Sequence, residues 1–194
     1  MKHQIINVRG PSGSGKTTVA RRLLTEHPAE MLMGSDGKIK GYHIDARSSG
    51  IKTPVYLVGS YANTCGGLDG INSQEEIASR IVKAYEFGHV LAEGLLTSKS
   101  SLGGHVAPIL RDHGAIFAFL STPLETCLER VLARRKAAGN DKEFDPKKSL
   151  ISGWECCARS AELLTEAGGC DVRQLDWQNP YPQVLQYFKD AEND

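Results

Sequence analysis

Three absences narrow the function of this chain before any motif is considered. The 194 residues contain no apolar run long enough to cross a membrane, and the N-terminus carries a single lysine before a short apolar segment, which is not a secretion signal. Basic and acidic residues balance at 23 each, so any nucleic-acid contact must be local. We therefore expect a cytoplasmic protein without membrane contacts.

The chain also lacks the cysteine and histidine spacing that is typical of disulfide-rich or zinc-binding proteins. The five cysteines form an odd set without C-x-x-C spacing, and the six histidines are scattered. This pattern excludes a disulfide framework and argues against a zinc site. With 40% hydrophobic residues the chain can bury a good core, and we expect one domain over 1–194.

What the chain does contain is a dense glycine motif, RGPSGSGKTT, at Arg9 to Thr18. The apolar run Gln4 to Val8 precedes it and an amphipathic run, Lys16 to Glu26, follows, which predicts a strand, a loop and a helix. The spacing G-x-x-x-x-G-K-T is the full P-loop pattern in the context that it requires. The residues expected to bind the nucleotide are Gly10, Pro11, Ser12, Gly13, Ser14, Gly15, Lys16, Thr17 and Thr18.

The P-loop pattern has a direct chemical meaning. The glycines let backbone N–H groups turn inward around phosphate oxygens, and the start of the helix adds partial positive charge. Lys16 can bridge the β- and γ-phosphates, and Thr17 offers a hydroxyl to Mg²⁺. We expect a nucleoside triphosphate and Mg²⁺ as ligands.

The rest of the chain alternates strands with helices. Buried strands are predicted at His89 to Glu93, Ala115 to Leu120 and Cys170 to Leu175, with amphipathic helices between them and a short helix at Pro182 to Lys189. Strands separated by helices pair in parallel through right-handed crossovers. The predicted fold is a three-layer α/β sandwich with a parallel sheet, of the P-loop NTPase type.

Residues 31–72 break this alternation. A hairpin-type SDG turn and the run Pro54 to Val58 predict a small β-rich insertion. The next stretch, GSYANTCGGLDGI at Gly59 to Ile71, is read as a substrate-binding loop at the carboxyl edge of the sheet. There Tyr61 could stack on a base and Asp69 could accept a hydroxyl proton. The alternative is an ordinary surface loop.

Glu93 ends a predicted strand in the sequence HVLAEG. In P-loop proteins an acidic residue at such a strand end holds Mg²⁺, directly or through water. The same carboxylate could instead orient or deprotonate an attacking hydroxyl. Both roles are open, as is that of a solvated glutamate, and Gly94 permits a ligand to approach closely.

A basic segment follows the third strand. Between positions 130 and 148 there are seven basic and three acidic residues. Arg130 and Arg134 lie one helical turn apart, so both can face one phosphate chain. Guanidinium donors on a mobile segment stabilise a migrating phosphoryl group, so 130–148 is predicted to be a lid. A solvated basic helix end is the alternative.

Three segments carry a family resemblance. GPSGSGKTT, the EG strand end and STPLETCLERVLARRKAAG resemble the nucleoside and nucleotide kinase branch of P-loop proteins. Within it, GYHIDARSSGIKTPVYLVGSYANTCGGLDGI and LAEGLLTS resemble phage kinases that phosphorylate the hydroxymethyl group of 5-hydroxymethyluracil in DNA. The resemblance implies ATP and Mg²⁺ at Gly10 to Thr17, Glu93 serving the metal or the nucleophile, and Arg130 and Arg134 closing over phosphates. Glu93-Gly94 departs from the Asp-Gly or Asp-Arg frequent in small-nucleotide kinases.

The sequence thus predicts an ATP- and Mg²⁺-dependent kinase for a hydroxyl of a pyrimidine nucleotide unit, with hydroxymethyluracil in DNA as the leading acceptor. Two alternatives stay open: a nucleoside or nucleoside-monophosphate kinase, and a P-loop switch or motor ATPase. The expected partners are ATP and a nucleotide or DNA acceptor, with no obligate protein partner. A phage-encoded chain would work in the host cytoplasm.

Overall fold

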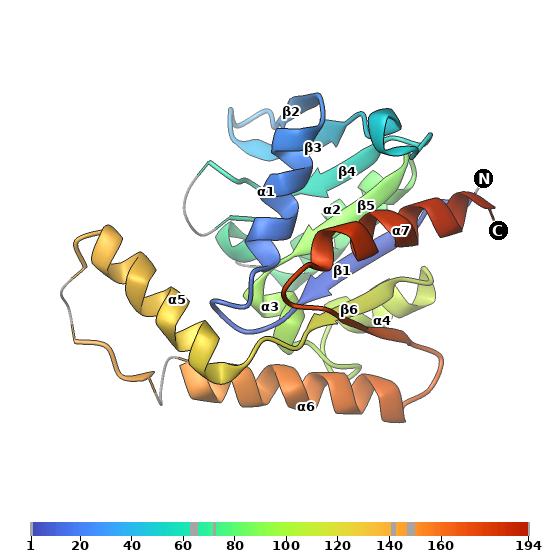
Figure 1. Cartoon of the computed structure of the whole chain (residues 1–194). Helices are drawn as coiled ribbons and strands as arrows, with labels where there is room; N and C mark the ends of the chain where they lie inside the picture. The colour runs from blue at the N-terminus through green and yellow to red at the C-terminus, as the bar shows by residue number, and fades with distance from the viewer. Residues whose placement is uncertain (1, 63–65, 72, 141–142, 147–149, 194) are drawn as a thin grey trace.

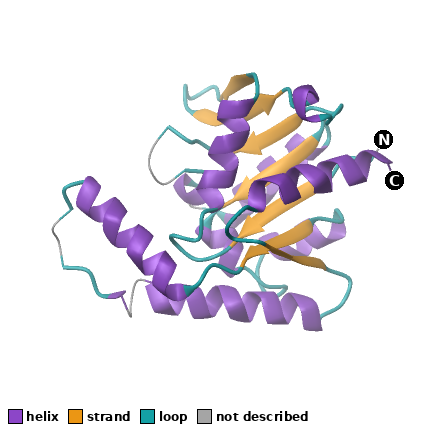
Figure 2. Ribbon diagram, viewed as in Figure 1, coloured by secondary structure: helices purple, strands orange, loops and turns teal. Residues whose placement is uncertain are grey.

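The computed structural model describes residues 2–62, 66–71, 73–140, 143–146 and 150–193. A central sheet lies between two layers of helices (Figures 1 and 2). The strands are β1 (Ile5–Arg9), β2 (Ala29–Met33), β3 (Ile39–Ile44), β4 (Val55–Val58), β5 (His89–Glu93), β6 (Ile116–Leu120) and β7 (Asp171–Leu175). The α-helices are α1 (Lys16–Glu26), α2 (Gln74–Tyr85), α3 (Leu95–Lys99), α4 (Val106–Asp112), α5 (Leu124–Ala137), α6 (Ser152–Glu166) and α7 (Pro180–Asn193), and the 3₁₀ turns are η1 (Arg47–Ser49) and η2 (Leu68–Gly70).

The sheet order is β2-β3-β4-β5-β1-β6-β7. The five strands from β4 to β7 pair in parallel, and β2 and β3 are added as an antiparallel hairpin. β1 therefore has parallel neighbours on both sides, with Val8 opposite Glu93 of β5. This register brings the P-loop and Glu93 to the same carboxyl edge of the sheet.

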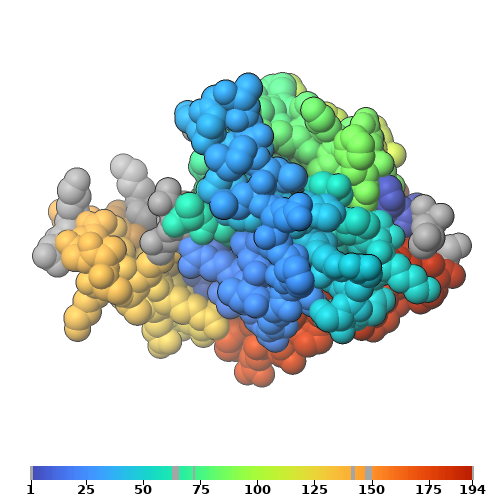
Figure 3. Space-filling view, turned by 90° about the horizontal axis from the view of Figure 1, so that it is seen from above, coloured from blue at the N-terminus to red at the C-terminus, as the bar shows by residue number. Residues whose placement is uncertain are grey.

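The predicted β-rich insertion needs one correction. Its last run, β4, pairs in parallel with β5, with Val55 opposite His89, so it is a strand of the central sheet. The run is short and almost wholly apolar because both of its faces are covered, as expected for a buried parallel strand. Only the β2–β3 hairpin lies outside the parallel part, and it extends the same sheet to an exposed edge that faces the viewer in Figure 3.

Two apolar clusters hold the layers together. On one face, α1 and α7 contribute Val19, Leu23, Val184 and Phe188. On the other, α2, α4 and α6 contribute Ile77, Ile81, Leu110 and Leu164. All of these side chains are 1% exposed or less. Because the apolar stripe of α1 is turned inward, its arginines face outward along the helix.

Most of the predicted elements are present, and the differences have local causes. α1 and β5 have the predicted bounds, whereas α7 runs from Pro180 to Asn193 and is longer than the predicted short helix. α3 and α4 were not predicted because each is short and has no side-chain N-cap, and α4 contains Pro108, which a helix tolerates in its first turn. Within the described ranges, no helix is long and apolar enough to cross a bilayer.

The C-terminal part of α5 projects away from the body of the molecule (Figures 1 and 3). It has its own small apolar cluster, in which Cys127, Val131 and Leu150 are buried. The predicted lid, 130–148, includes 141–142 and 147–148, which lie outside the described residues. The predicted insertion and loop, 31–72, likewise include 63–65 and 72, which lie outside them.

Candidate active site

The P-loop joins β1 to α1 and packs tightly against α5. Gly13 and Gly15 adopt positive φ angles of 82° and 105°. A Cβ on Gly13 would lie 2.4 Å from the carbonyl oxygen of Cys127, so only glycine fits between the loop and α5. Of the nine predicted loop residues, six line a cavity and Gly10, Pro11 and Ser14 lie behind it. The six are Ser12, Gly13, Gly15, Lys16, Thr17 and Thr18.

Lys16 lies folded across the loop. Its side-chain ammonium donates hydrogen bonds to the carbonyl oxygens of Gly10, at 2.8 Å, and Pro11, at 3.0 Å. Burial lowers the pKa of Lys16, and the nearby Glu93 carboxylate opposes this shift. The ammonium is therefore held by oxygen atoms at the loop, where phosphate oxygens are alternative acceptors.

Glu93 lies behind Thr17 at the end of β5. It is 1% exposed, and its Oε1 accepts a hydrogen bond from the Thr17 hydroxyl at 3.2 Å. Burial raises the pKa of Glu93 to about 7, Lys16 opposes this and Asp69 adds to it. Within the described part of the chain, Oε2 has no partner in hydrogen-bonding geometry. A buried carboxylate with a spare oxygen beside a hydroxyl suits a hard divalent cation such as Mg²⁺.

The loop after β4 closes over Glu93. A Cβ on Gly67, whose φ is 72°, would lie 2.5 Å from Glu93 Oε1, so the loop backbone touches the carboxylate. Tyr61 is 6% exposed, and its hydroxyl lies beside Glu93, outside strict hydrogen-bonding geometry. Burial raises the pKa of Tyr61 well above its usual value, and the Glu93 charge raises it further.

The burial of Tyr61 corrects one predicted role. The ring packs near that of Tyr42, with centroids 6.1 Å apart, and it has no open face on which a base could stack. Residue patterns do not indicate this burial, because the close packing depends on a glycine, Gly66, whose Cβ would lie 2.7 Å from the Tyr61 ring. Tyr61 stays at the site as a neighbour of Glu93.

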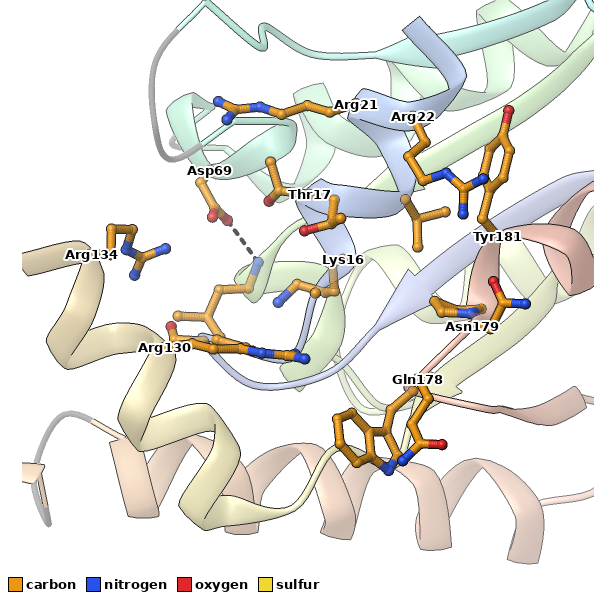
Figure 4. Close-up of a pocket in the computed structure, with 18 residues that line it drawn as sticks. Lys16, Thr17, Arg21, Arg22, Asp69, Arg130, Arg134, Gln178, Asn179 and Tyr181 are labelled. Carbon is orange, nitrogen blue, oxygen red and sulfur yellow. Dashed lines mark hydrogen bonds between the residues drawn. The ribbon is translucent and has the colours of Figure 1, made fainter. Parts of the chain in front are cut away.

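A cavity of about 500 Å³ runs along α1, and its lining residues are shown in Figure 4. On α1, Thr17 and Arg21 are one turn apart, and so are Thr18 and Arg22. The Trp177 end of the cavity is lined by Arg22, Trp177, Gln178, Asn179, Pro180 and Tyr181. The Asp69 end is lined by Arg21, Asp69, Leu95 and Arg134.

The Trp177 end was not predicted. Apart from Arg22 of α1, its residues lie between β7 and the first turn of α7, in a segment that reads as a plain loop. In the structure the Arg22 guanidinium lies 4.3 Å from the Tyr181 ring centroid, and that of Arg130 lies 5.5 Å from the Trp177 ring. The one available signal was position, because this loop follows a strand of the parallel sheet and so lies at its carboxyl edge.

The Asp69 end holds the predicted acidic residue. Asp69 is exposed to the cavity, and its Oδ1 accepts a hydrogen bond from the Leu95 backbone N–H at 2.7 Å. The carboxylate thus lies on the cavity wall with one oxygen held by the backbone. Glu93 is absent from the lining of this cavity. Of the two acidic residues predicted at the site, Asp69 therefore lines the cavity and Glu93 does not.

The basic face of α5 is divided as its helical spacing predicts. Arg130 and Arg134 both line the cavity, and Arg130 donates to the carbonyl oxygens of Gly13, at 3.2 Å, and Ser14, at 3.4 Å. Arg135 turns the other way, with its guanidinium 4.9 Å from the Phe144 ring. Arg130 therefore contacts the P-loop, Arg134 lines the cavity, and Arg135 supports the fold of the α5 region.

Beneath the loop lies a charge that sequence reasoning missed. Arg9 is fully buried and donates to Asn7 Oδ1 at 2.6 Å, to the Ser100 carbonyl at 2.8 Å and to Ser160 Oγ at 3.0 Å. Burial lowers the pKa of Arg9 to about 9. Phe117 and Phe119 lie against the guanidinium. Arg9 thereby joins the start of the P-loop to α6.

Comparison with known proteins agrees with this geometry. A family model described as an AAA domain matches residues 5–150. The chain belongs to this AAA-domain family. It is also 32% identical, over 97% of its length and 98% of the relative's, to "5-hmdU DNA kinase" of Pseudomonas phage PaMx11. A second such kinase, of Pseudomonas phage M6, is 30% identical over 92% of this chain and 94% of the relative.

A solved structure of deoxyadenosine kinase from M. mycoides matches 98% of this AAA-domain chain and 98% of its own, with 10% identity and a TM-score of 0.43. The family and the kinase relatives agree with the P-loop geometry described above. The AAA-domain chain is a P-loop phosphotransferase with a nucleotide substrate.

Proposed function

We propose that this chain transfers the γ-phosphate of ATP to the hydroxymethyl oxygen of 5-hydroxymethyluracil in DNA, with Mg²⁺ as the cofactor. One observation carries the proposal: a single cavity connects the P-loop with an accessible carboxylate, Asp69, that is suited to a hydroxyl acceptor. The relatives named 5-hmdU DNA kinase support the choice of acceptor.

The Trp177 end of the cavity fits the nucleoside of ATP. Trp177 and Tyr181 offer aromatic faces, and Gln178 and Asn179 offer amides that can hydrogen-bond a base. The triphosphate then reaches the P-loop, where backbone N–H groups and Lys16 receive it. Arg130, bound to the loop carbonyls, is placed to neutralise charge on the transferred group. Residues 130–148 would act as the lid in this scheme.

The two carboxylates take different roles. Glu93 is buried behind Thr17, so we assign these two residues to Mg²⁺, which would neutralise charge on the β- and γ-phosphates when bound. Asp69 is on the cavity wall and takes the proton of the acceptor hydroxyl. The acceptor oxygen forms a bond to the γ-phosphorus as the bond from that phosphorus to the β,γ-bridging oxygen breaks, and ADP leaves.

The proposal is tested by transfer from labelled ATP to oligonucleotides that contain 5-hydroxymethyluracil or thymine at the same position. We expect label only in the hydroxymethyl-bearing strand, located on the base by nuclease digestion and mass spectrometry, and none with Lys16→Met. A panel of free nucleosides and nucleoside monophosphates runs in parallel. Preferred transfer to a free monophosphate would replace this proposal with the nucleotide-kinase alternative.

The proposed reaction requires only ATP and a DNA acceptor as partners, and no obligate protein partner. An enzyme that modifies phage DNA acts where that DNA is made, so the proposed site of action is the host cytoplasm.

A further inference from the structure

Two arginines flank the carboxylate at the Asp69 end of the cavity. Arg21 comes from α1 and Arg134 from α5, and both line the same cavity as Asp69. Figure 4 shows the Asp69 carboxylate between the guanidinium group of Arg21 above it and that of Arg134 below it. In the proposed reaction the attacking hydroxyl lies at this carboxylate, so both cations lie beside the acceptor.

Helix geometry assigns Arg21 to the acceptor and not to ATP. Arg21 is one turn beyond Thr17, on the side of α1 that faces Asp69, whereas Arg22 is one turn beyond Thr18 and packs on Tyr181. Lys16 and Arg130 contact the P-loop itself, where the triphosphate binds in the proposed scheme. The Asp69 end has two further cations, Arg21 and Arg134.

The charge of the acceptor decides what these cations are for. A hydroxymethyl pyrimidine base is uncharged, and it needs a carboxylate for its hydroxyl but no guanidinium group. Paired arginines are suited to phosphate oxygens, which they bind with charge-assisted hydrogen bonds. An exposed pair of cations on both sides of the hydroxyl site indicates an acceptor with phosphate on both sides of the reactive base.

We propose that Arg21 and Arg134 bind phosphate groups of the acceptor on the two sides of the reactive nucleoside, and that they make the enzyme select a nucleotide within a strand. This inference rests on the proposed function. It adds which part of the acceptor is recognised, namely a phosphate group next to the nucleoside that bears the reactive hydroxyl. Nucleoside monophosphates and nucleic-acid strands both carry such a group. A 5′-monophosphate supplies one such group and an internal phosphodiester position supplies two.

The test compares three acceptors with the same base: 5-hydroxymethyldeoxyuridine, its 5′-monophosphate and a trinucleotide with that nucleotide in the centre. For wild type, kcat/KM should rise at each step, by about 10-fold per phosphate contact. Arg21→Gln and Arg134→Gln should each remove about one step, chiefly through KM, and leave KM for ATP unchanged. Arg159→Gln, an exposed arginine of α6 outside the cavity lining, is the matched control and should behave as wild type.

Thermal melting of each variant and its KM for ATP verify that the fold and the nucleotide end are intact, and Arg21→Lys should recover part of the loss. The inference is overturned if the variants keep the wild-type ranking of the three acceptors while transfer to the trinucleotide proceeds. It is also overturned if the free nucleoside is the best acceptor of wild type. Failure of the proposed function has a different signature: no variant, nor wild type, transfers phosphate to any of the three.

Discussion

The two ends of the cavity are built in different ways. In the proposed scheme the phosphate side of the nucleotide site comes from one continuous run, Gly10 to Thr18, six of whose residues line the cavity. The Asp69 end is assembled from α1, η2, α3 and α5, which are far apart in the sequence. A continuous motif fixes its own geometry through glycine conformations, whereas an assembled site inherits its geometry from the packing of whole elements.

The largest effect should follow from substitution of Lys16, which lines the cavity at the P-loop, between its two ends. We expect Lys16→Met to lower kcat/KM roughly 100- to 1,000-fold with every acceptor, because the ammonium contributes where phosphate charge develops. Steady-state kinetics against both ATP and the DNA acceptor measure this. An effect confined to the acceptor KM would mean that Lys16 does not face the nucleotide.

Asp69→Asn should impair the reaction at the Asp69 end without impairing ATP binding. The amide keeps the shape and the contact with the Leu95 N–H but cannot take a proton, so we expect kcat to fall about 100-fold with little change in KM for ATP. Single-turnover transfer with pre-bound ATP checks this. Unchanged chemistry in that assay would move the base to another residue.

The pH dependence of the free energy of unfolding tests the environment of the buried Glu93 carboxylate. Its pKa is raised to about 7, so in the metal-free protein its contribution to the free energy of unfolding is complete below the unfolded pKa near 4.5 and is lost as pH rises through 7. Glu93→Gln should therefore gain stability relative to wild type between pH 5 and 8, by on the order of 3 kcal/mol at most. Urea unfolding with a chelator present measures it.

The control for this titration is Glu155→Gln, which changes an exposed carboxylate of α6. It should show no such slope against wild type. Parallel curves for Glu93→Gln and wild type over the whole pH range would contradict the assignment. Mg²⁺ should stabilise wild type more than Glu93→Gln if Glu93 serves the metal.

The smallest effect is expected at the Trp177 end. Trp177→Ala removes one aromatic face from the nucleoside site, and we expect KM for ATP to rise about 10-fold while KM for the DNA acceptor stays constant. Phenylalanine at the same position should restore most of the affinity. A matching rise in KM for DNA would show that the ends are not independent.

Features that depend on one continuous stretch of sequence could be predicted, whereas features assembled from distant elements could not. The P-loop, α1 and β5 were predicted with their bounds because local patterns determine them, and the spacing of Arg130 and Arg134 predicted their common face. The position of β4, the Trp177 end and Arg21 were missed because they depend on strand order and on which elements meet at the sheet edge. The burial of Tyr61 depends on glycine contacts made across a loop, which no periodicity reveals.

Arg9 has a mechanical consequence. α6 is fastened to it through Ser160, and α5 is fastened a few residues later through the contact of Cys127 with Gly13. α5 and α6 are thus both attached to the short segment from Arg9 to Gly13, at the base of the P-loop. A displacement of the P-loop on ligand binding would therefore move both helices at once.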